Sequence, residues 1–176
     1  TEFTDINRES PLATKLGIGL SRGERFEWVL QKATELGVSE IFPLITERTE
    51  VKLKGDREEK KLQRWHQVII SACEQCGRNR LPRLHQPMSL EKWVETPADI
   101  KLVFHHRSEM GFESLREIKP TSVAMAIGPE GGHSEREIDY LLANNFKALT
   151  LGPRIFRTET APIAALTVFQ SLWGDF

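Results

Sequence analysis

Short apolar segments alternate along this chain with amphipathic segments of helical length, and this alternation strongly limits the folds available to it. The segments expected to be extended are residues 15–20, 39–46, 81–86, 100–105, 122–127 and 147–151, and those expected to be helical are 24–36, 57–76, 89–94, 134–144 and 160–173, with a weak helical turn at 114–118. Strands that alternate with helices predict an α/β fold, in which helices flank a parallel sheet on both faces. The segment 122–127 is almost continuously apolar, which is typical of a strand buried on both faces.

The size and composition of the chain are those of an ordinary globular protein. Its 176 residues are enough to bury a core without disulfides, and contents of 39% hydrophobic and 28% charged residues argue against a disordered or collagen-like chain. Because it has only two cysteines, we expect a reducing, cytoplasmic location. No apolar run approaches the roughly 18 residues that cross a bilayer, so we expect no membrane segment.

Positive charge is concentrated in one part of the chain. The net charge of −1 argues against nucleic-acid binding by bulk charge alone. Between Arg48 and Arg83, however, the sequence has ten lysines and arginines and five acidic residues. This basic stretch is either a solvated helix face or a surface that binds a polyanion.

A glycine-rich turn, Gly-Pro-Glu-Gly-Gly at residues 128–132, lies between the buried strand and a helix that Ser134 and Glu137 are expected to cap. Ligands of parallel sheets lie at the carboxyl ends of the strands, where glycines allow close backbone approach. The turn lacks the lysine and hydroxyl residue of a phosphate-binding P-loop and the glycine spacing of a dinucleotide site. It is therefore either a binding loop for a nucleotide-like ligand or a plain connection between strand and helix.

A second connection between a strand and a helix, residues 151–161, carries Arg154, Arg157, Thr158 and Glu159. Taken singly, a threonine can cap the helix, a glutamate can complement its dipole, and the arginines can be solvated. Their density on one loop at a strand end, where functional residues concentrate, favours a binding or catalytic site.

Two other patterns are compatible with a metal site. Cys73 and Cys76 form a C-x-x-C pair, but a structural zinc site normally needs four ligands and the chain has no second pair. On a helix these thiols are better explained as small, half-buried residues. His105 and His106 are adjacent on a strand and should point to opposite faces, so they do not make a shared site. We therefore expect no metal.

In combination, these motifs resemble the ribosomal small subunit methyltransferase E family, which belongs to the SPOUT superfamily of RNA methyltransferases. The resemblance covers about residues 16–173 and rests on four motifs in order, which are 31–37 (QKATELG), 74–78 (EQCGR), 127–132 (IGPEGG) with Ser134 and Glu137, and 151–161 (LGPRIFRTETA). Phe156 and Cys76 differ from the residues that are usual in the family. The resemblance implies an S-adenosylmethionine-dependent enzyme that methylates N3 of a uridine in the 16S ribosomal RNA of the small subunit.

The resemblance also implies a particular fold and cofactor site. The C-terminal segment would thread a loop to form a trefoil knot, and members of the fold usually act as homodimers. S-adenosylmethionine would lie among three loops, and a Cβ at Gly131 would block its pocket. The residues implied to bind the cofactor are Phe104, His105, Gly128, Pro129, Glu130, Gly131, Leu151, Gly152, Arg154, Ile155 and Phe156.

The same interpretation assigns roles in catalysis and RNA binding. An anionic uridine needs positive charge nearby, for which Arg157 and Arg154 are the candidates, and Glu159 is the carboxylate on that loop available as a base. We favour Arg157 over Arg154. The candidates for RNA binding in the basic stretch are Lys52, Lys54, Lys60, Lys61, Gln75, Arg78 and Arg80.

Members of the family carry an N-terminal RNA-binding barrel of the PUA type, and the residues before Leu12 are too few to form one. We therefore expect residues 1–12 to be a linker or the remnant of a missing PUA-like barrel, and residues 13–176 to form the SPOUT methyltransferase domain. Two alternatives stay open. The first alternative to uridine N3 methylation of 16S ribosomal RNA is a SPOUT methyltransferase that acts on another RNA or at ribose 2′-O. The second is a non-catalytic RNA-binding module that has kept the fold.

Overall fold

The strands and helices alternate along the chain as the sequence predicts. The computed structural model describes residues 7–53, 55–105 and 108–176. Its strands are β1 (Ala13–Gly19), β2 (Glu40–Ile45), β3 (Arg83–Leu84), β4 (Met88–Ser89), β5 (Ile100–Phe104), β6 (Ser122–Ile127) and β7 (Lys147–Leu149). Its helices are α1 (Arg25–Glu35), α2 (Asp56–Cys76), α3 (Leu90–Trp93), α4 (Glu135–Ala143) and α5 (Thr160–Trp173), and a 3₁₀ turn spans Phe112–Leu115.

The strands form one sheet in the order β3-β2-β1-β6-β5-β7, and β4 also pairs with β2. Every pairing between the described strands is parallel, so that Leu16 of β1, for example, lies opposite Ile41 of β2 and Met125 of β6. Parallel neighbours need long crossover connections, and the helices provide them. The predicted fold class, a parallel α/β sheet flanked by helices, is confirmed.

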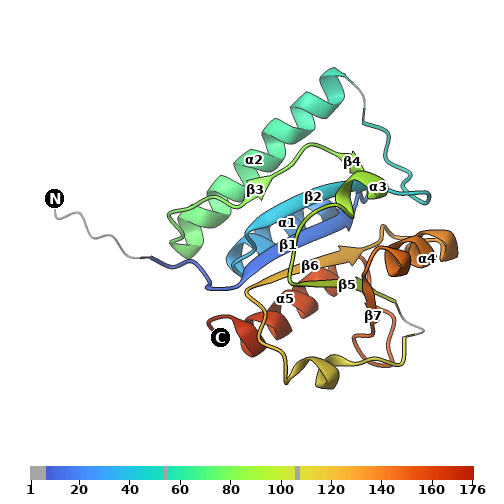
Figure 1. Ribbon diagram of the computed structural model, residues 1–176. Coiled ribbons are helices and arrows are strands. Elements are labelled where there is room, and N and C mark those ends of the chain that lie inside the picture. The colour runs from blue at the N-terminus through green and yellow to red at the C-terminus, as the bar shows by residue number, and fades with distance from the viewer. Residues whose placement is uncertain (1–6, 54, 106–107) are drawn as a thin grey trace.

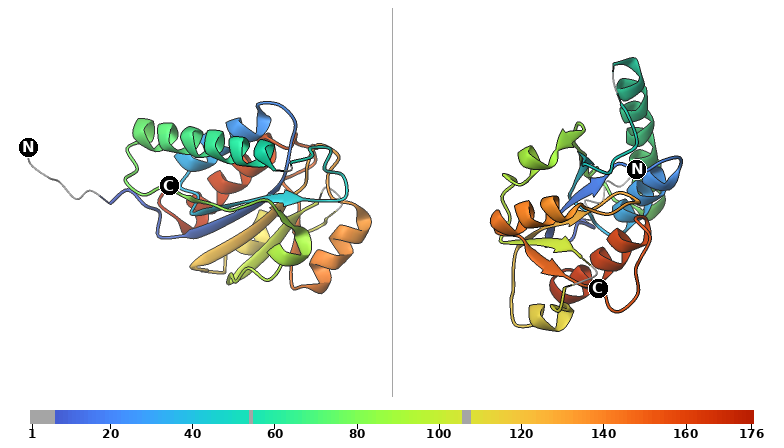
Figure 2. Two further views of the ribbon diagram at one scale, coloured as in Figure 1. Left: turned by 90° about the horizontal axis from the view of Figure 1, so that it is seen from above. Right: turned by 90° about the vertical axis from the view of Figure 1, so that its right-hand side faces the viewer.

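The helices cover both faces of this sheet (Figure 1). α1, α2 and α5 lie on one face, and α3 and α4 lie on the other, as the view from above in Figure 2 shows. Each face has its own cluster of buried side chains. β6 contributes Met125 to the first cluster and Ala124 and Ala126 to the second, which confirms the prediction of a strand buried on both faces.

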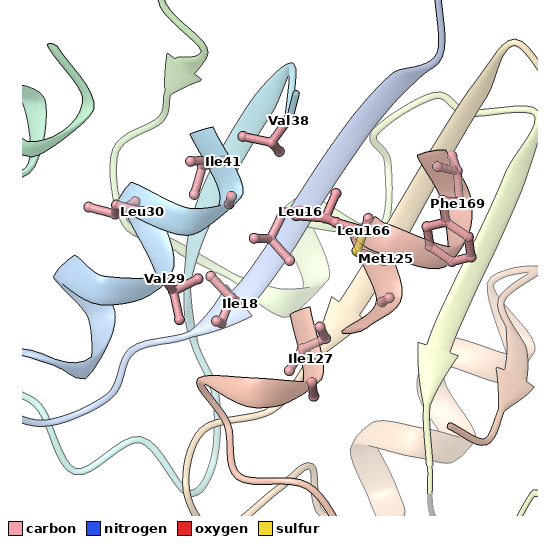
Figure 3. Close-up of a cluster of buried hydrophobic side chains, with 14 of the residues drawn as sticks. Leu16, Ile18, Val29, Leu30, Val38, Ile41, Met125, Ile127, Leu166 and Phe169 are labelled. Carbon is pink, nitrogen blue, oxygen red and sulfur yellow. The ribbon is translucent and has the colours of Figure 1, made fainter. Parts of the chain in front are cut away.

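The larger core lies between the sheet and the helices α1 and α5 (Figure 3). Leu16 and Ile18 project into it from β1. Val29 of α1 and Leu166 of α5 meet them there, and all four side chains are inaccessible to solvent. Burial of one such side chain contributes about 1.5–3 kcal/mol before entropy is counted. The two central strands, β1 and β6, are therefore held firmly, and the loops that follow them start from fixed points.

The helix ends follow signals in the sequence. α2 ends at Gly77, whose φ of 78° is in the left-handed region that glycine adopts without strain. Ser134 and Glu137 form the predicted capping box at the start of α4, which also fixes where the glycine-rich turn ends. Among the described helices, none combines the length and the apolar character needed to cross a membrane.

Three short elements differ from the sequence prediction. The helical turn expected at 114–118 is the 3₁₀ turn at Phe112–Leu115, β4 was not predicted, and β7 ends at Leu149 instead of continuing to residue 151. β7 ends there because the Thr150 amide donates to the carbonyl oxygen of Met110, 2.8 Å away and outside the sheet. Elements of this length are determined by such tertiary contacts, which hydrophobic periodicity does not encode.

Candidate functional site

A cleft opens at the edge of the sheet where the strands end. Because β5, β6 and β7 are parallel, the loops that follow them emerge at the same edge. These three loops line a cleft of about 410 Å³. A volume of this size lies in the range of cofactor and small-molecule sites.

The structure brings almost all of the predicted cofactor residues together in this cleft. Those that line it are Phe104, His105, Gly128, Pro129, Glu130, Gly131, Leu151, Arg154, Ile155 and Phe156. Gly152 belongs to the same loop, and its φ of 97° allows the chain to turn there. The predicted catalytic residues Arg157 and Glu159 also line the cleft. The sequence prediction therefore placed these residues at one site, while their individual roles stay a prediction.

Glycines at two positions let the backbone segments of the site approach closely. A Cβ added to Gly128 would lie 2.6 Å from the carbonyl carbon of Gly132, and one added to Gly19 at the end of β1 would lie 2.4 Å from the nitrogen of Pro129. Both distances are shorter than side-chain carbons tolerate. The Gly132 amide donates to the carbonyl oxygen of Pro129 at 2.8 Å and closes the turn. The turn is therefore a compact, hydrogen-bonded loop that packs against β1.

Side chains from distant segments hold the first half of this glycine-rich turn. The Thr158 hydroxyl donates to the carbonyl oxygen of Gly128 at 2.7 Å, which joins the turn to the loop after β7. Glu130 accepts from the Arg22 amide at 2.9 Å and from the Arg25 guanidinium at 3.2 Å, which joins it to the start of α1. One oxygen of the Glu130 carboxylate is thus engaged within the protein, which ties the turn to the start of α1.

The second half of the turn is held by Arg48, which the sequence analysis did not select. Arg48 Nη1 donates to the carbonyl oxygens of Gly131 at 2.6 Å and of His133 at 3.3 Å. A Cβ added to Gly131 would lie 3.2 Å from Cδ of Arg48. A side chain at Gly131 would therefore press on Arg48, which also lines the cleft, and the expectation that it would block the pocket stays a prediction.

The loop after β7 presents unpaired polar groups and apolar surface to the same cleft. Arg154, Arg157 and Glu159 have no hydrogen-bond or ion-pair partner for their side chains among the residues that the structure describes. Both arginines are exposed, and Glu159 lies directly before α5. Ile155 is 79% exposed, which is unusual for a large apolar side chain, and Phe156 beside it is half-buried. The loop can therefore offer both charge and apolar contact to a ligand.

Glu137 joins three parts of the site through one carboxylate. One oxygen accepts from the Glu47 amide at 2.8 Å and the other from the Ser134 amide at 2.9 Å, while Nδ1 of His133 lies 3.6 Å away. Burial alone would raise the pKa of Glu137, but His133 and the two amides stabilise the charged form and lower the pKa to about 2. The carboxylate is therefore charged at neutral pH and links the loop after β2 to the start of α4.

Most of the predicted RNA-binding residues are on the surface. Those that are exposed are Lys52, Lys60, Gln75 and Arg80. Lys61 is partly engaged, because its ammonium lies 3.5 Å from the Glu27 carboxylate. Lys54 lies outside the described residues. Lys52 and Lys60 are thus the lysines of this set best placed to contact phosphate.

The structure corrects the expectation for Arg78. Its side chain is only 5% exposed and forms an ion pair with Glu9, whose Oε1 lies 3.2 Å from Nε. Its Nη1 also donates to the carbonyl oxygens of Thr34 and Val38, at 2.8 and 3.1 Å. Arg78 therefore fastens the end of α2 to the end of α1, and its guanidinium is not available to RNA.

Several residues that line the cleft were not assigned a role from the sequence, although Gly132 and Thr158 lie within the two loops that it singled out. The full set is Arg25, Arg48, Ile127, Gly132, His133, Ile138, Leu149, Thr150, Thr158 and Ala161. Arg25 and Arg48 both follow a strand end, β1 and β2 respectively, so a systematic search after every predicted strand would have included them. His133 directly follows the glycine-rich turn but has no distinguishing pattern of its own.

The two thiols have structural environments. Cys73 is buried and Cys76 is half-buried, and burial raises the pKa of the Cys73 thiol above its usual value. Within the described residues, no group of three or more histidine, cysteine or acidic side chains is arranged to hold a metal ion. Cys73 is a small core residue on the inner face of α2 and more deeply buried than expected, whereas Cys76 is half-buried as expected.

The chain is similar to known RNA methyltransferases. Residues 8–170 match the family model of the RNA methyltransferase domain. The chain is 38% identical over 173 residues to ribosomal RNA small subunit methyltransferase E of Buchnera aphidicola, covering 97% of this chain and 68% of that protein. It is 35% identical over 178 residues to the enzyme of the same name from Bacillus subtilis, covering 96% of this chain and 70% of that protein.

Solved structures with the same fold include two with a bound cofactor. A methyltransferase of Legionella pneumophila in complex with the cofactor SAM has a TM-score of 0.95 and 46% sequence identity, covering 98% of this chain and 72% of that one. Ribosomal RNA small subunit methyltransferase E of Neisseria gonorrhoeae, bound to S-adenosyl methionine, has a TM-score of 0.89 and 40% identity, covering 98% and 71%.

Replacement of Glu137 by glutamine should destabilise the protein at neutral pH by about 1–3 kcal/mol, because two amides lose a charged acceptor. The folded-state pKa of about 2 lies below the ordinary 4.5, so the charged carboxylate stabilises the fold above pH 4.5, and this contribution is lost as the pH falls toward 2. The free energies of unfolding of the two proteins, measured by urea denaturation, should converge over that range. Asp139→Asn, at an exposed position of the same helix, is the control. A difference that does not change with pH would contradict the prediction.

Proposed function

Because this chain belongs to the ribosomal RNA small subunit methyltransferase E family, we propose that it binds S-adenosylmethionine and transfers its methyl group to N3 of a uridine in 16S ribosomal RNA. One observation carries the proposal. The three loops that the sequence resemblance assigned to the cofactor meet in one cleft of suitable volume. The two similar structures that hold this cofactor support it.

The residues of the cleft fit S-adenosylmethionine. The compact glycine-rich turn brings backbone amides and carbonyls within reach of a ligand, and such groups can bind the edge of an adenine ring. Ile155, Phe156 and Phe104 line the cleft and offer apolar surface for the ring face. When bound there, the cofactor supplies an electrophilic methyl group.

The chain itself must handle a proton and a charge. Methylation at N3 requires removal of the N3 proton, which leaves negative charge on the O2 and O4 side of the uracil ring. We assign acceptance of the proton to the Glu159 carboxylate, and stabilisation of the charge to the Arg157 guanidinium, with Arg154 as a second cation. These three side chains line the cleft and have no partner among the described residues, so no internal contact must break before they act.

The proposal extends to the surroundings of the enzyme. It would act in the cytoplasm on the small ribosomal subunit, without a metal and as a homodimer. α1 and α5 pack against each other, and the exposed Trp28 of α1 and the half-buried Ile163 of α5 leave apolar surface that a second copy can cover. The trefoil knot, and the division into residues 1–12 and a methyltransferase domain at residues 13–176, stay predictions from the resemblance.

Calorimetric titration with S-adenosylmethionine, followed by a methyl-transfer assay, tests this function. We expect binding that is unchanged by a chelator, and methylation at uridine N3 of small ribosomal subunits that lack the modification, detected by mass spectrometry of the nucleosides. Cofactor binding without methyl transfer would favour the non-catalytic RNA-binding module. A methyl group found at ribose 2′-O, or on another RNA, would favour the other alternative.

Arg157→Ala should lower turnover by roughly two to three powers of ten while cofactor binding is kept, because the developing uridine anion loses its stabilising charge. The measurement is single-turnover methylation at saturating RNA and cofactor, beside calorimetry. Arg154→Ala, on the same loop, is the matched comparison and should have the smaller effect. Normal turnover in the Arg157 variant would show that the role is assigned to the wrong residue.

Replacement of both Lys52 and Lys60 by glutamine should weaken RNA binding and leave turnover at saturating RNA nearly unchanged. Both side chains are exposed, and phosphate contacts contribute affinity that is largely independent of sequence. Each lysine that no longer neutralises a phosphate should reduce the slope of log affinity against log salt concentration by roughly 0.7–0.9. Lys119→Gln is the control, because this exposed lysine precedes β6 at the opposite edge of the sheet. Equal reductions of affinity in both variants would count against a localised RNA surface.

A further inference from the structure

Arg48 has an unusual position for an exposed arginine. Its guanidinium points back into the protein and donates from Nη1 to two backbone carbonyl oxygens of the glycine-rich turn, those of Gly131 and His133, at 2.6 and 3.3 Å. The two carbonyls flank Gly132, whose φ is 68°. One cation therefore spans the part of the turn where the backbone changes direction.

Arg48 lies in a tight turn, residues 46–49, whose first and last residues hydrogen-bond to each other. The Thr49 amide donates to the carbonyl oxygen of Thr46 at 3.0 Å, and the Thr46 amide donates to the Thr49 hydroxyl at 3.0 Å. Between them, the Glu47 amide donates to Glu137 at 2.8 Å. Arg48 thus projects from a closed turn that is fastened to β2 on one side and to α4 on the other.

The glycine-rich turn needs such an external support. Fixing the backbone of one residue costs about 1–2 kcal/mol in conformational entropy, and glycine loses the most freedom of all residues. The first half of the turn is held by Thr158 through Gly128 and by Arg25 through Glu130. Among the side chains that the structure describes, Arg48 is the one that bonds to the carbonyls of Gly131 and His133.

We propose that Arg48 is a positioning residue for the cofactor, which fixes the second half of the glycine-rich turn in its binding conformation before the ligand arrives. The inference rests on the proposed function, since it takes the cleft to be the S-adenosylmethionine site. Arg48 acts through the two carbonyls. Without it, part of the binding energy of the cofactor is spent on ordering the turn, so affinity falls.

The competing explanation is that Arg48 binds an RNA phosphate, and its surroundings disfavour this. Its Nη1 already serves two carbonyl oxygens, which fixes the guanidinium against the turn. A second hollow beside the cleft is lined by Arg48 together with Glu47, Glu50 and Glu130. These three carboxylates balance the arginines that pair with them, Arg136, Arg22 and Arg25, so Arg48 does not lie in a cluster of free cations that would attract a phosphate group.

The test compares three single variants of the full chain. Arg48→Met keeps the length of the side chain and removes its donors, and Arg48→Lys keeps the charge with a less suitable donor geometry. Arg136→Met is the matched control, because Arg136 is 90% exposed and approaches the same segment only through a 3.9 Å contact with Glu47. The measurements are the dissociation constant of S-adenosylmethionine by calorimetry, RNA affinity without cofactor, and hydrogen exchange of the Gly132 amide.

We expect Arg48→Met to weaken cofactor binding about tenfold and Arg48→Lys about threefold, with RNA affinity and turnover at saturating substrates changed less than about threefold. The Gly132 amide should exchange about tenfold faster in Arg48→Met, since its bond to Pro129 opens more often when the turn is loose. Arg136→Met should match the wild type in all three measurements.

Two results would overturn the proposal. One is unchanged cofactor affinity in both Arg48 variants, and the other is a decrease confined to RNA affinity, which would make Arg48 a phosphate contact. If Arg48→Met does not fold, Arg48→Lys still decides, because its predicted decrease in cofactor affinity does not depend on the methionine variant. Failure of the wild type itself to bind S-adenosylmethionine would refute the proposed function, and hydrogen exchange would then still decide whether Arg48 orders the turn.

Discussion

The parallel pairing of β5, β6 and β7 is the constraint on which the candidate site depends. In a parallel sheet all connections that leave the carboxyl ends of the strands lie at one edge, so loops separated by dozens of residues in the chain come together there. Because β6 is buried on both faces, its last residue is held in place, and this fixes the position at which the glycine-rich turn begins. The capping box of α4 fixes where it ends.

Between these fixed ends, two features determine the conformation of the turn: its glycines have no Cβ, and its carbonyl oxygens accept hydrogen bonds from side chains outside the turn. The absence of a Cβ at Gly128 and at Gly19 lets two backbone segments approach more closely than side chains allow. The carbonyl oxygens of the turn then accept from Thr158 and Arg48, which lie after and before the turn in the sequence. A loop that would otherwise be mobile is therefore ordered by the parts of the fold around it. This is the arrangement that a binding site needs if the ligand is not to supply the ordering energy itself.

The sequence predicts the parts of this structure that local signals determine. Alternating patterns predicted the parallel sheet, Gly77 marked the end of α2, and Ser134 with Glu137 marked the start of α4. It did not predict contacts between residues that are distant in the chain. Arg78 reads as a surface cation, but its partner Glu9 lies 69 residues earlier, and only the tertiary fold, which places the segment before β1 beside the end of α2, brings the two together. Arg48 was missed for the same reason, because its acceptors are backbone atoms 83 and 85 residues later.

Whether an arginine of the site has a hydrogen-bond partner within the protein distinguishes a structural role from a functional one. Arg25, Arg48 and Arg78 each have an acceptor within the described protein, so each contributes to holding a loop or a helix end. Arg154 and Arg157 have none among the described residues, although they line the same cleft as Arg25 and Arg48. A guanidinium left unpaired in a cleft keeps its full set of donors for whatever enters, and it does so without breaking an internal bond. Because Glu159 on the same loop is also unpaired, this side of the cleft offers both a cation and a base, while the glycine-rich side offers backbone groups and has its own charges neutralised. Under the proposed function, the charged side chains of the loop after β7 suit a reacting base that gains negative charge, while the backbone of the glycine-rich turn and the apolar side chains of Ile155 and Phe156 suit a neutral ring.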